Sequence, residues 1–202
     1  MTTQLYKFVA WSFRAKNISR WPLQKKLIQA NVAEHTYEVT TVASLIAHID
    51  KEIFKNENID ILQVVMIANM HESSEFSGVG DVNTKCKNYD TETKKAFKRL
   101  EHLFELKLIK TLPDELQSVY KRIIQPDKNS YEAKIVKAAD LICALEEAHT
   151  ELRLNNNEFR TASQDVKNHL TLFENELPAV KYFMNHFFPC FNDDFDQLNE
   201  KD

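Results

Sequence analysis

Apolar residues recur every three or four positions over most of this chain, which is the spacing that places them on one face of an α-helix. A long example begins near residue 33, where Val39, Val42, Ala43 and Ile46 fall on a single face. A helix with this pattern buries its apolar face and turns the opposite face to water. The pattern therefore predicts an amphipathic helix that packs against other helices.

The same spacing predicts helices along the rest of the chain. Prolines mark some of the breaks: Pro113 suits the first turn of a short helix that ends before Pro126, and Pro178 lies where the last helix is expected to bend or break. Besides the helix from residue 33, the predicted helices cover residues 4–16, 59–75, 90–110, 113–125, 130–154 and 162–188.

Composition strengthens the helical interpretation. The chain has 202 residues with only 2 glycines and 5 prolines, which leaves little material for the many turns of a β-sandwich or barrel. This length suits one domain with a substantial core. We therefore expect a single all-α domain, a helical bundle, over residues 1–190. Residues 191–202 form an acidic tail that we expect to be mobile.

Charge and cysteine usage exclude several classes of protein. A net charge of -4 and a pI near 6.0 give no general attraction to a nucleic acid polymer or an anionic membrane. The 3 cysteines are far apart, which argues against a disulfide framework and a zinc ribbon. No signal peptide and no apolar stretch of about 20 residues, the length of a membrane span, is visible. We therefore expect a cytoplasmic protein that binds neither a nucleic acid polymer nor a membrane.

The two glycines of the chain, Gly78 and Gly80, lie directly behind His71, Glu72 and Glu75. On a helix these three side chains fall within about one third of the circumference, so they project toward a common volume. Burying such charges is costly unless they are paired or bind a metal. The glycines predict a tight loop that brings the following carboxylate, Asp81, back toward the cluster. The alternative is an ordinary helix whose last turn is exposed.

A second candidate is Asp140, which interrupts the most apolar helical segment of the chain, residues 135–145. Aspartate is a poor helix former and is rarely buried alone. It is therefore either a ligand or catalytic carboxylate, or the partner of a salt bridge or hydrogen bond to a neighbouring helix. His35 lies near the start of the second helix, and its neighbouring residues do not mark it as a ligand. Most single histidines likewise carry no sign of function in their local sequence.

Common catalytic motifs are absent from the sequence. The segment His71-Glu72-Ser73-Ser74-Glu75 begins like the zinc-protease motif HExxH, but it lacks the second histidine. There is no P-loop, GxGxxG fingerprint or GxSxG nucleophile elbow.

Several short motifs in a fixed order resemble the HD-domain phosphohydrolases, and most closely the bacterial 5′-deoxynucleotidase branch. They are SRWPL at 19–23, NVAEH at 31–35, HESSE at 71–75, GD at 80–81, VKAAD at 136–140, NNEF at 156–159, YFM at 182–184 and FFP at 187–189. The resemblance spans nearly the whole chain. It implies an HD-domain helical bundle.

The resemblance also implies one divalent metal ion. In the family the metal is held by a histidine, a His-Asp pair and a distant aspartate, and the matching positions here are His35, His71 with Glu72, and Asp140. Mixed imidazole and carboxylate ligation suits manganese, cobalt, zinc or iron. Such a metal polarises the phosphoryl group and makes a water nucleophilic near neutral pH.

The other site residues follow from the same resemblance. Glu75 and Asp81 would manage protons at the phosphate and the leaving oxygen. Arg20 would grip the phosphate through its bidentate fork, and Trp21 would pack against the deoxyribose and disfavour a 2′-hydroxyl. Without the resemblance, Arg20 and Trp21 would be interpreted as a surface arginine beside a core tryptophan.

The loop after Asp81 completes the implied site, with Thr84 and Lys87 expected to bind substrate. This loop departs from the family, because residues 82–85 replace a Leu-Pro-Thr-Pro stretch and one residue is inserted within 76–80. A second departure is Glu72, which stands in place of the defining aspartate and carries one extra methylene.

The resemblance thus implies a metal-dependent phosphohydrolase that removes the 5′-phosphate from deoxyribonucleoside monophosphates, and by analogy a homodimer. Two alternatives stay open. One is a deoxynucleoside triphosphate hydrolase of the same superfamily. The other is a nucleotide-binding protein with weakened catalysis, which the replacement at Glu72 suggests.

Overall fold

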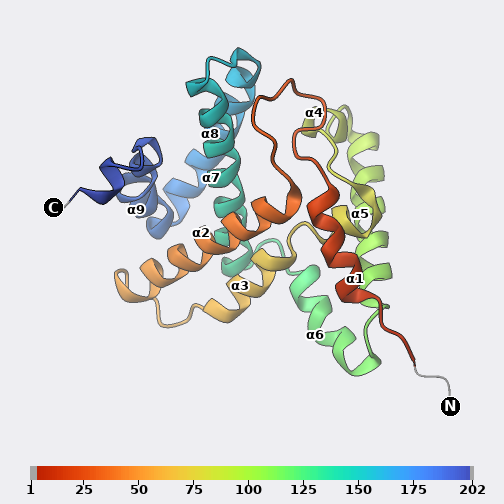
Figure 1. Ribbon diagram of the computed structural model, residues 1–202. Coiled ribbons are helices and arrows are strands. Elements are labelled where there is room, and N and C mark those ends of the chain that lie inside the picture. Colours follow the sequence, from red (N-terminus) through yellow and green to blue (C-terminus); the bar gives the residue numbers. More distant parts are fainter. Residues whose placement is uncertain (1–3, 201–202) are drawn as a thin grey trace.

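A computed structural model describes residues 4–200, and within this span all named secondary-structure elements are helices or helical turns (Figure 1). In these residues the only β-type pairing is one isolated antiparallel bridge between Ser19 and Asn31. The predicted all-α fold is confirmed.

The elements follow one another with short connections. Their bounds are α1 Phe8–Ser12, η1 Phe13–Asn17, α2 Val32–Glu52, α3 Ile61–Met70, η2 Glu75–Val79, α4 Thr84–Lys87, α5 Thr91–Ile109, α6 Asp114–Ile124, α7 Tyr131–Arg153, η3 Asn157–Phe159, α8 Arg160–Glu176, α9 Pro178–His186, η4 Phe188–Asn192 and η5 Gln197–Asn199. Here η2 is a single π-helical turn, and the other η elements are 3₁₀ turns.

Side-chain caps fix where the two site-bearing helices begin. The Asn31 side chain accepts hydrogen bonds from the backbone N–H groups of Ala33 and Glu34, and the Glu34 carboxylate bonds back to the Asn31 N–H. This reciprocal arrangement is a capping box. Ser130 caps α7 in a similar way by accepting from the N–H of Ala133. The first turn of α2, which carries His35, is therefore held firmly.

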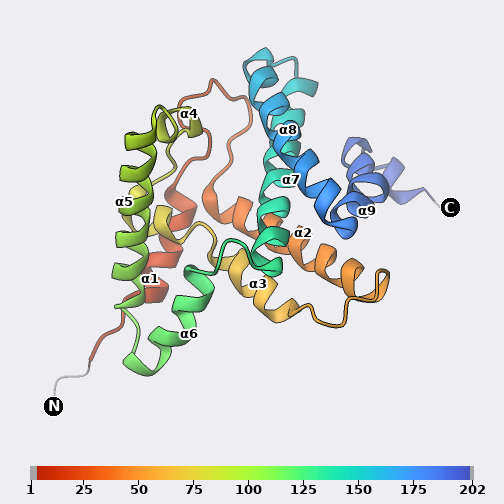
Figure 2. The same cartoon turned by 180° about the vertical axis from the view of Figure 1, so that it is seen from behind.

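Helices α2, α3 and α7 form the centre of the molecule, with α7 in contact with both other helices and with α8. Residues that meet there, such as Ile46, Val64 and Ile142, are fully buried. Helices α8 and α9 lie on one side of this centre, and α1, α5 and α6 lie on the other (Figures 1 and 2).

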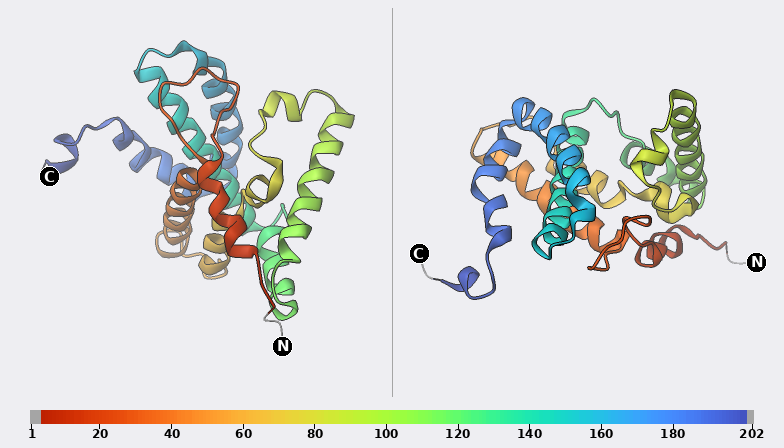
Figure 3. Two further views of the ribbon diagram at one scale, coloured as in Figure 1. Left: turned by 45° about the vertical axis from the view of Figure 1, so that its right-hand side comes forward. Right: turned by 90° about the horizontal axis from the view of Figure 1, so that it is seen from above.

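A second, smaller core joins α1, α5 and the turn η2 around Phe8, Phe76 and Leu108. Figure 3 shows α5 standing apart from α7 and α8, with the segment 70–90 crossing between these two halves. The predicted site residues lie along this crossing, in the first turn of α2, in the middle of α7 and in the segment 18–31 that precedes α2.

Some element boundaries differ from the predicted ones. The first helix begins at Phe8 rather than at residue 4 and becomes 3₁₀ after Ser12. The helix expected over 59–75 ends at Met70, because the chain turns at 71–72 and continues into η2. The break at Pro178 is confirmed, since Pro178 is the first residue of α9.

The C-terminal residues 191–200 are all exposed and include the short helix η5. Residues 1–3 and 201–202, which belong to the predicted domain and tail, lie outside the described part, and the mobility of the tail stays a prediction. Within residues 4–200, no helix is both long and apolar enough to span a lipid bilayer.

Candidate metal and phosphate site

The four residues expected to bind metal come from three separate elements and meet at one point. His35 lies in the first turn of α2, His71 and Glu72 directly follow α3, and Asp140 lies in the middle of α7. One potential ligand atom from each residue lies within 4.8 Å of the others. The fold therefore builds a mixed imidazole and carboxylate cluster from side chains that are up to about a hundred positions apart in the sequence.

His71 is oriented for ligation by its own helix. Its Nδ1 atom lies 2.6 Å from the carbonyl oxygen of Ala68, so Nδ1 carries the hydrogen and the lone pair is on Nε2. Within the described residues Nε2 is buried without a hydrogen-bond partner, and it lies 3.4 Å from Glu72 Oε1. A buried, unpaired nitrogen lone pair beside carboxylates fits a bound metal cation.

His35 is almost completely buried, with 1% of its surface exposed. Its Nε2 atom lies 3.1 Å from Asp140 Oδ1 and 3.7 Å from Glu72 Oε1. Burial by itself would lower the pKa of His35, but interactions with Asp140 and Glu147 outweigh it and raise the pKa to about 9. The negative surroundings that favour a proton on this nitrogen would equally favour a metal cation in its place.

Both carboxylates of the cluster are ionised at neutral pH. Burial opposes ionisation of Glu72, but the neighbouring His71 lowers its pKa to about 2. Burial likewise opposes ionisation of Asp140, but Lys137, whose Nζ lies 2.6 Å from Asp140 Oδ2, helps hold its pKa well below the usual range. The extra methylene of Glu72 does not remove its carboxylate from the cluster.

Glu75 and Asp81 flank the cluster on the glycine turn. Glu75 is buried at the start of η2, and its Oε2 atom has no hydrogen-bond partner among the described residues. Burial, together with the charges of Glu72 and Asp81, raises the pKa of Glu75 to about 9. Asp81 Oδ2 accepts a hydrogen bond from the backbone N–H of Trp21 at 3.0 Å, and burial raises its pKa.

The glycines allow this turn to form. Gly78 has φ +142°, and a Cβ atom there would lie 2.3 Å from the ring of Phe104 on α5. Gly80 has φ +75° with open space around it. Both values are unfavourable for other residues. The loop brings Asp81 close enough to Glu75 for its charge to raise the pKa of Glu75, and it places Asp81 beside the backbone N–H of Trp21.

Arg20 and Trp21 lie in the segment 18–31, which we call the strap and which runs between η1 and α2. Arg20 is only 8% exposed, and its Nη1 atom lies 3.5 Å from Glu72 Oε1. The Trp21 ring packs edge-on against Phe159, with centroids 5.3 Å apart. Arg20 is therefore not a surface arginine, and it faces the metal cluster.

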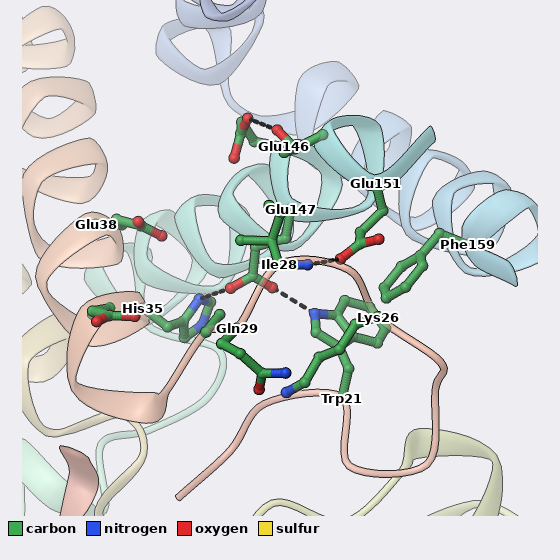
Figure 4. Close-up of a pocket in the computed structure, with 13 residues that line it drawn as sticks. Trp21, Lys26, Ile28, Gln29, His35, Glu38, Glu146, Glu147, Glu151 and Phe159 are labelled. Atoms are coloured by element: carbon green, nitrogen blue, oxygen red, sulfur yellow. Dashed lines mark hydrogen bonds and ion pairs between the residues drawn. The ribbon is translucent and has the colours of Figure 1, made fainter. Parts of the chain in front are cut away.

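Sequence reasoning missed Glu147, which binds Arg20 and Trp21 of the strap. Its carboxylate accepts hydrogen bonds from Arg20 Nε at 2.9 Å and Arg20 Nη2 at 3.1 Å. It also accepts one from Trp21 Nε1 at 2.7 Å and lies 3.5 Å from His35 Nδ1 (Figure 4). A signal was present, because Glu147 follows Asp140 by two helical turns and so lies on the same face of α7.

The two remaining predicted residues differ in their placement. Lys87 Nζ lies 3.8 Å from Glu75 Oε1 and 3.2 Å from Glu101 Oε1, so it borders the site through Glu75. Thr84 is exposed at the start of α4, and in the described part its side chain makes no hydrogen bond to the other predicted site residues. The structure therefore does not bring Thr84 into the cluster.

Beside the cluster lies a cavity of about 180 Å³. Trp21, His35, Glu147 and Phe159 are among the residues that line it, and Figure 4 shows that they come from the strap, α2, α7 and the segment after α7. The cavity thus shares its walls with the metal cluster and with the aromatic side chain of the strap.

Comparison with known proteins identifies the family. Residues 7–191 match the family described as 5′-deoxynucleotidase YfbR-like. The chain belongs to this family. Among its YfbR-like relatives, the 5′-deoxynucleotidase of Vibrio vulnificus is 36% identical over 193 residues, covering 95% of this chain and 97% of that protein. The 5′-deoxynucleotidase of Erwinia tasmaniensis is 34% identical over 195 residues, covering 96% of each chain.

Solved structures agree with the expected bundle. An HD-domain phosphohydrolase from Listeria innocua superposes with a TM-score of 0.80 at 25% identity, covering 96% of this chain and 90% of that chain. A protein from Magnetospirillum magnetotacticum described as a predicted metal-dependent phosphohydrolase gives 0.55 at 18% identity, covering 87% and 92%, and supports the fold alone. The predicted HD-domain fold of this YfbR-like chain is confirmed.

Proposed function

We propose that this protein is a metal-dependent 5′-deoxynucleotidase, which hydrolyses deoxyribonucleoside 5′-monophosphates to deoxynucleosides and orthophosphate. The observation that carries the proposal is the convergence of His35, His71, Glu72 and Asp140 within 4.8 Å, with Arg20 at its edge. Relatives that cover nearly the whole chain are named 5′-deoxynucleotidases, which supports the same reaction here.

The four clustered side chains would hold one divalent cation. Two imidazoles with two carboxylates suit manganese, cobalt, zinc or iron better than calcium or magnesium. When bound, such a cation acts as a Lewis acid on the phosphoryl oxygens and favours attack by water. Its ligands are supported from outside, because His71 is fixed by Ala68 and Asp140 by Lys137.

The strap would bind the substrate. Glu147 engages the Nε and Nη2 edge of Arg20, so the edge formed by Nη1 and Nη2 remains for two phosphate oxygens. Trp21 would pack against the deoxyribose, where a 2′-hydroxyl would meet the indole. Lys87, which borders the site through Glu75, would contact the substrate from the opposite loop, whereas the exposed Thr84 would not.

Glu75 is suited to give a proton to the leaving oxygen. It is buried, and its raised pKa keeps its carboxyl group protonated at neutral pH. A proton on its unpartnered Oε2 atom is available for transfer to O5′ as the P–O bond breaks. Asp81, held by the N–H of Trp21, would help to return that proton. General acid catalysis of this kind contributes about 10²- to 10⁴-fold in rate.

The test is phosphate release from matched deoxy and ribo monophosphates and from deoxynucleoside triphosphates. The protein is first stripped with EDTA and then supplied with manganese, cobalt, zinc or magnesium. We expect metal-dependent orthophosphate release from the deoxy monophosphates, and none from the His71→Ala variant under the same conditions.

Other outcomes would select the alternatives. Release of inorganic triphosphate from the triphosphates would identify a deoxynucleoside triphosphate hydrolase. Nucleotide binding without release under any metal would identify a binding protein, and a gain of turnover in Glu72→Asp would assign the loss to that residue.

A homodimer and a cytoplasmic location are part of the same proposal. Sedimentation equilibrium should give a species of twice the 23.6 kDa chain mass. A monomer at micromolar concentration would contradict the dimer. Cell fractionation should find the protein with other cytoplasmic enzymes, and recovery in the membrane or secreted fraction would contradict that location.

A further inference from the structure

We infer that Glu147 is a positioning residue that fixes the phosphate-binding Arg20, the sugar-facing Trp21 and the metal-binding His35 relative to one another. This inference rests on the proposed function for the roles of its three partners. The contacts themselves are properties of the structure, so part of the test does not require activity.

The contact with Arg20 determines which edge of the guanidinium is free. Glu147 Oε1 lies 2.9 Å from Nε, and Oε2 lies 3.1 Å from Nη2, which is a bidentate pair. The remaining atom, Nη1, points to the metal cluster, 3.5 Å from Glu72 Oε1. Glu147 thus sets the direction in which Arg20 meets a phosphate.

The contact with Trp21 fixes the indole. Its Nε1–H donates to Glu147 Oε2 at 2.7 Å, while its backbone N–H donates to Asp81. Trp21 also has φ +54°, a conformation that is uncommon for a bulky residue. With its ring edge-on to Phe159, the indole is held at several points while it lines the cavity.

The contact with His35 reaches the metal cluster. His35 Nδ1 lies 3.5 Å from Glu147 Oε1 (Figure 4), beyond hydrogen-bond geometry, whereas Asp140 lies at the other ring nitrogen, Nε2. A negative charge there favours a hydrogen on Nδ1 and therefore a lone pair on Nε2. A carboxylate behind a metal-binding histidine fixes the ring and raises its basicity.

The carboxylate is necessary for this arrangement. Glu147 has 12% of its side chain exposed, and only a carboxylate accepts at both oxygens. In Glu147→Gln the amide group would turn a donor toward at least one of the donors of Arg20 and Trp21, and the negative charge beside His35 would be lost. The variant would keep the shape of the side chain and lose its function as a common acceptor.

The first experiment compares Glu147→Gln with Glu146→Gln in steady-state kinetics. Glu146 is adjacent on α7, but its carboxylate contacts Thr150 and Arg153 instead. We expect KM for a deoxy monophosphate to rise by about 10- to 100-fold in Glu147→Gln, with a smaller change in kcat and a reduced preference for deoxy over ribo substrates. Glu146→Gln should match the wild type.

The second experiment measures the same group of contacts without turnover. The chain has 2 tryptophans, so a Trp11→Phe background leaves Trp21 as the only indole. There, Glu147→Gln should shift the emission of Trp21 to longer wavelength and increase its quenching by acrylamide. Calorimetric titration with manganese should also show an affinity reduced by about 10-fold, as is typical for residues behind a metal ligand.

The outcomes separate the role of Glu147 from the proposed function. Unchanged KM, unchanged Trp21 emission and unchanged manganese affinity in Glu147→Gln would overturn the inference even if the wild type is an active nucleotidase. If the wild type releases no phosphate, the proposed function fails, while emission and metal affinity still decide the part played by Glu147. Should Glu147→Gln not fold, Glu147→Asp, which keeps the charge, is expected to show the same changes in weaker form.

Discussion

At the scale of single residues, Glu72 decides whether the site works. It replaces the aspartate of the HD pair, and its carboxylate reaches the cluster, 3.4 Å from His71 Nε2 and 3.7 Å from His35 Nε2. In this chain the cluster is therefore shaped around the longer side chain. The replacement thus keeps a carboxylate within the group of candidate ligands and changes only its reach.

This geometry makes the substitution Glu72→Asp informative. We expect it to lower manganese affinity by about 10-fold or more, because it withdraws the carboxylate by one carbon–carbon bond from a site that tolerates about 0.5 Å. Calorimetric titration of the EDTA-stripped protein measures this affinity. Tighter binding in Glu72→Asp would show that the native residue weakens the metal site, and the exposed control Glu158→Gln should bind as the wild type does.

The residues that were predictable share a feature visible in the sequence. Asp140 stood out in an apolar segment, and His71 with Glu75 stood out before the two glycines. Glu147 did not, because it lies among other glutamates at 146 and 151, and only the strap brings Arg20 and Trp21 to it. The spacing of seven residues places Glu147 on the same face of α7 as Asp140, but nothing in the sequence shows that the strap lies against this face.

At the scale of elements, the turn η2 depends on Gly78. A Cβ at this position would meet Phe104 at 2.3 Å in a backbone conformation with φ +142°. We expect Gly78→Ala to lower the free energy of unfolding by about 2–5 kcal/mol, the sum of backbone strain and overpacking. Urea denaturation followed by circular dichroism measures this loss.

Gly80 supplies the matched control for that prediction. It also has a positive φ, +75°, but no atom lies within 4 Å of the position that a Cβ would take there. Gly80→Ala should therefore cost only the backbone strain, about 1–3 kcal/mol. Equal losses in the two variants would show that the contact with Phe104 is unimportant.

The strap is anchored to α7 by a second carboxylate. Glu151 is 3% exposed and accepts hydrogen bonds from the backbone N–H groups of Leu27 and Ile28 and from the side chain of Asn156. Burial would raise the pKa of Glu151, but these hydrogen bonds lower it below 4.5. The folded state therefore favours the ionised form.

The sign of the pH dependence follows from this shift. Because the folded-state pKa of Glu151 lies below the unfolded one, its contribution is complete above about pH 4.5 and is lost as the pH falls. We expect Glu151→Gln to be about 2–3 kcal/mol less stable than the wild type at pH 7. In urea denaturation the difference should shrink toward pH 3, and a difference that stays constant over this range would contradict the assignment.

Element boundaries show which part of the fold periodicity determines. The apolar stripe located the start of α2 and both ends of α5 and α7 to within about two residues, and a capping side chain stands at the start of each of these helices. The predicted helix extended past the end of α3 at Met70. The residues after Met70 are buried because they form the site, and not because they pack one helix against another. Functional side chains thus obscured the boundary.

At the scale of the whole molecule, the site is where separate parts of the fold meet. Its four candidate ligands come from α2, the end of α3, and α7, and the core beneath them joins the same helices. A cation bound to all four would cross-link these elements. Occupancy of this site by a metal would therefore be coupled to global stability.

Removal of metal should consequently lower stability. At a free manganese concentration 100 times the dissociation constant, the folded state gains about 2.7 kcal/mol. We expect the urea midpoint to rise on addition of manganese to the EDTA-stripped protein and to fall back when EDTA is restored. His71→Ala should show no such shift, and an equal shift in that variant would place manganese elsewhere.

The strap also has a consequence for redesign of the enzyme. Its two ends are joined by the bridge between Ser19 and Asn31, so the segment begins and finishes at the same place. Between these ends it rests on Glu147 and Glu151, two positions one turn apart on a single helix. An exchange with the corresponding segment of a relative therefore needs to carry these two helix positions along, together with Asp81 and Phe159, which contact Trp21.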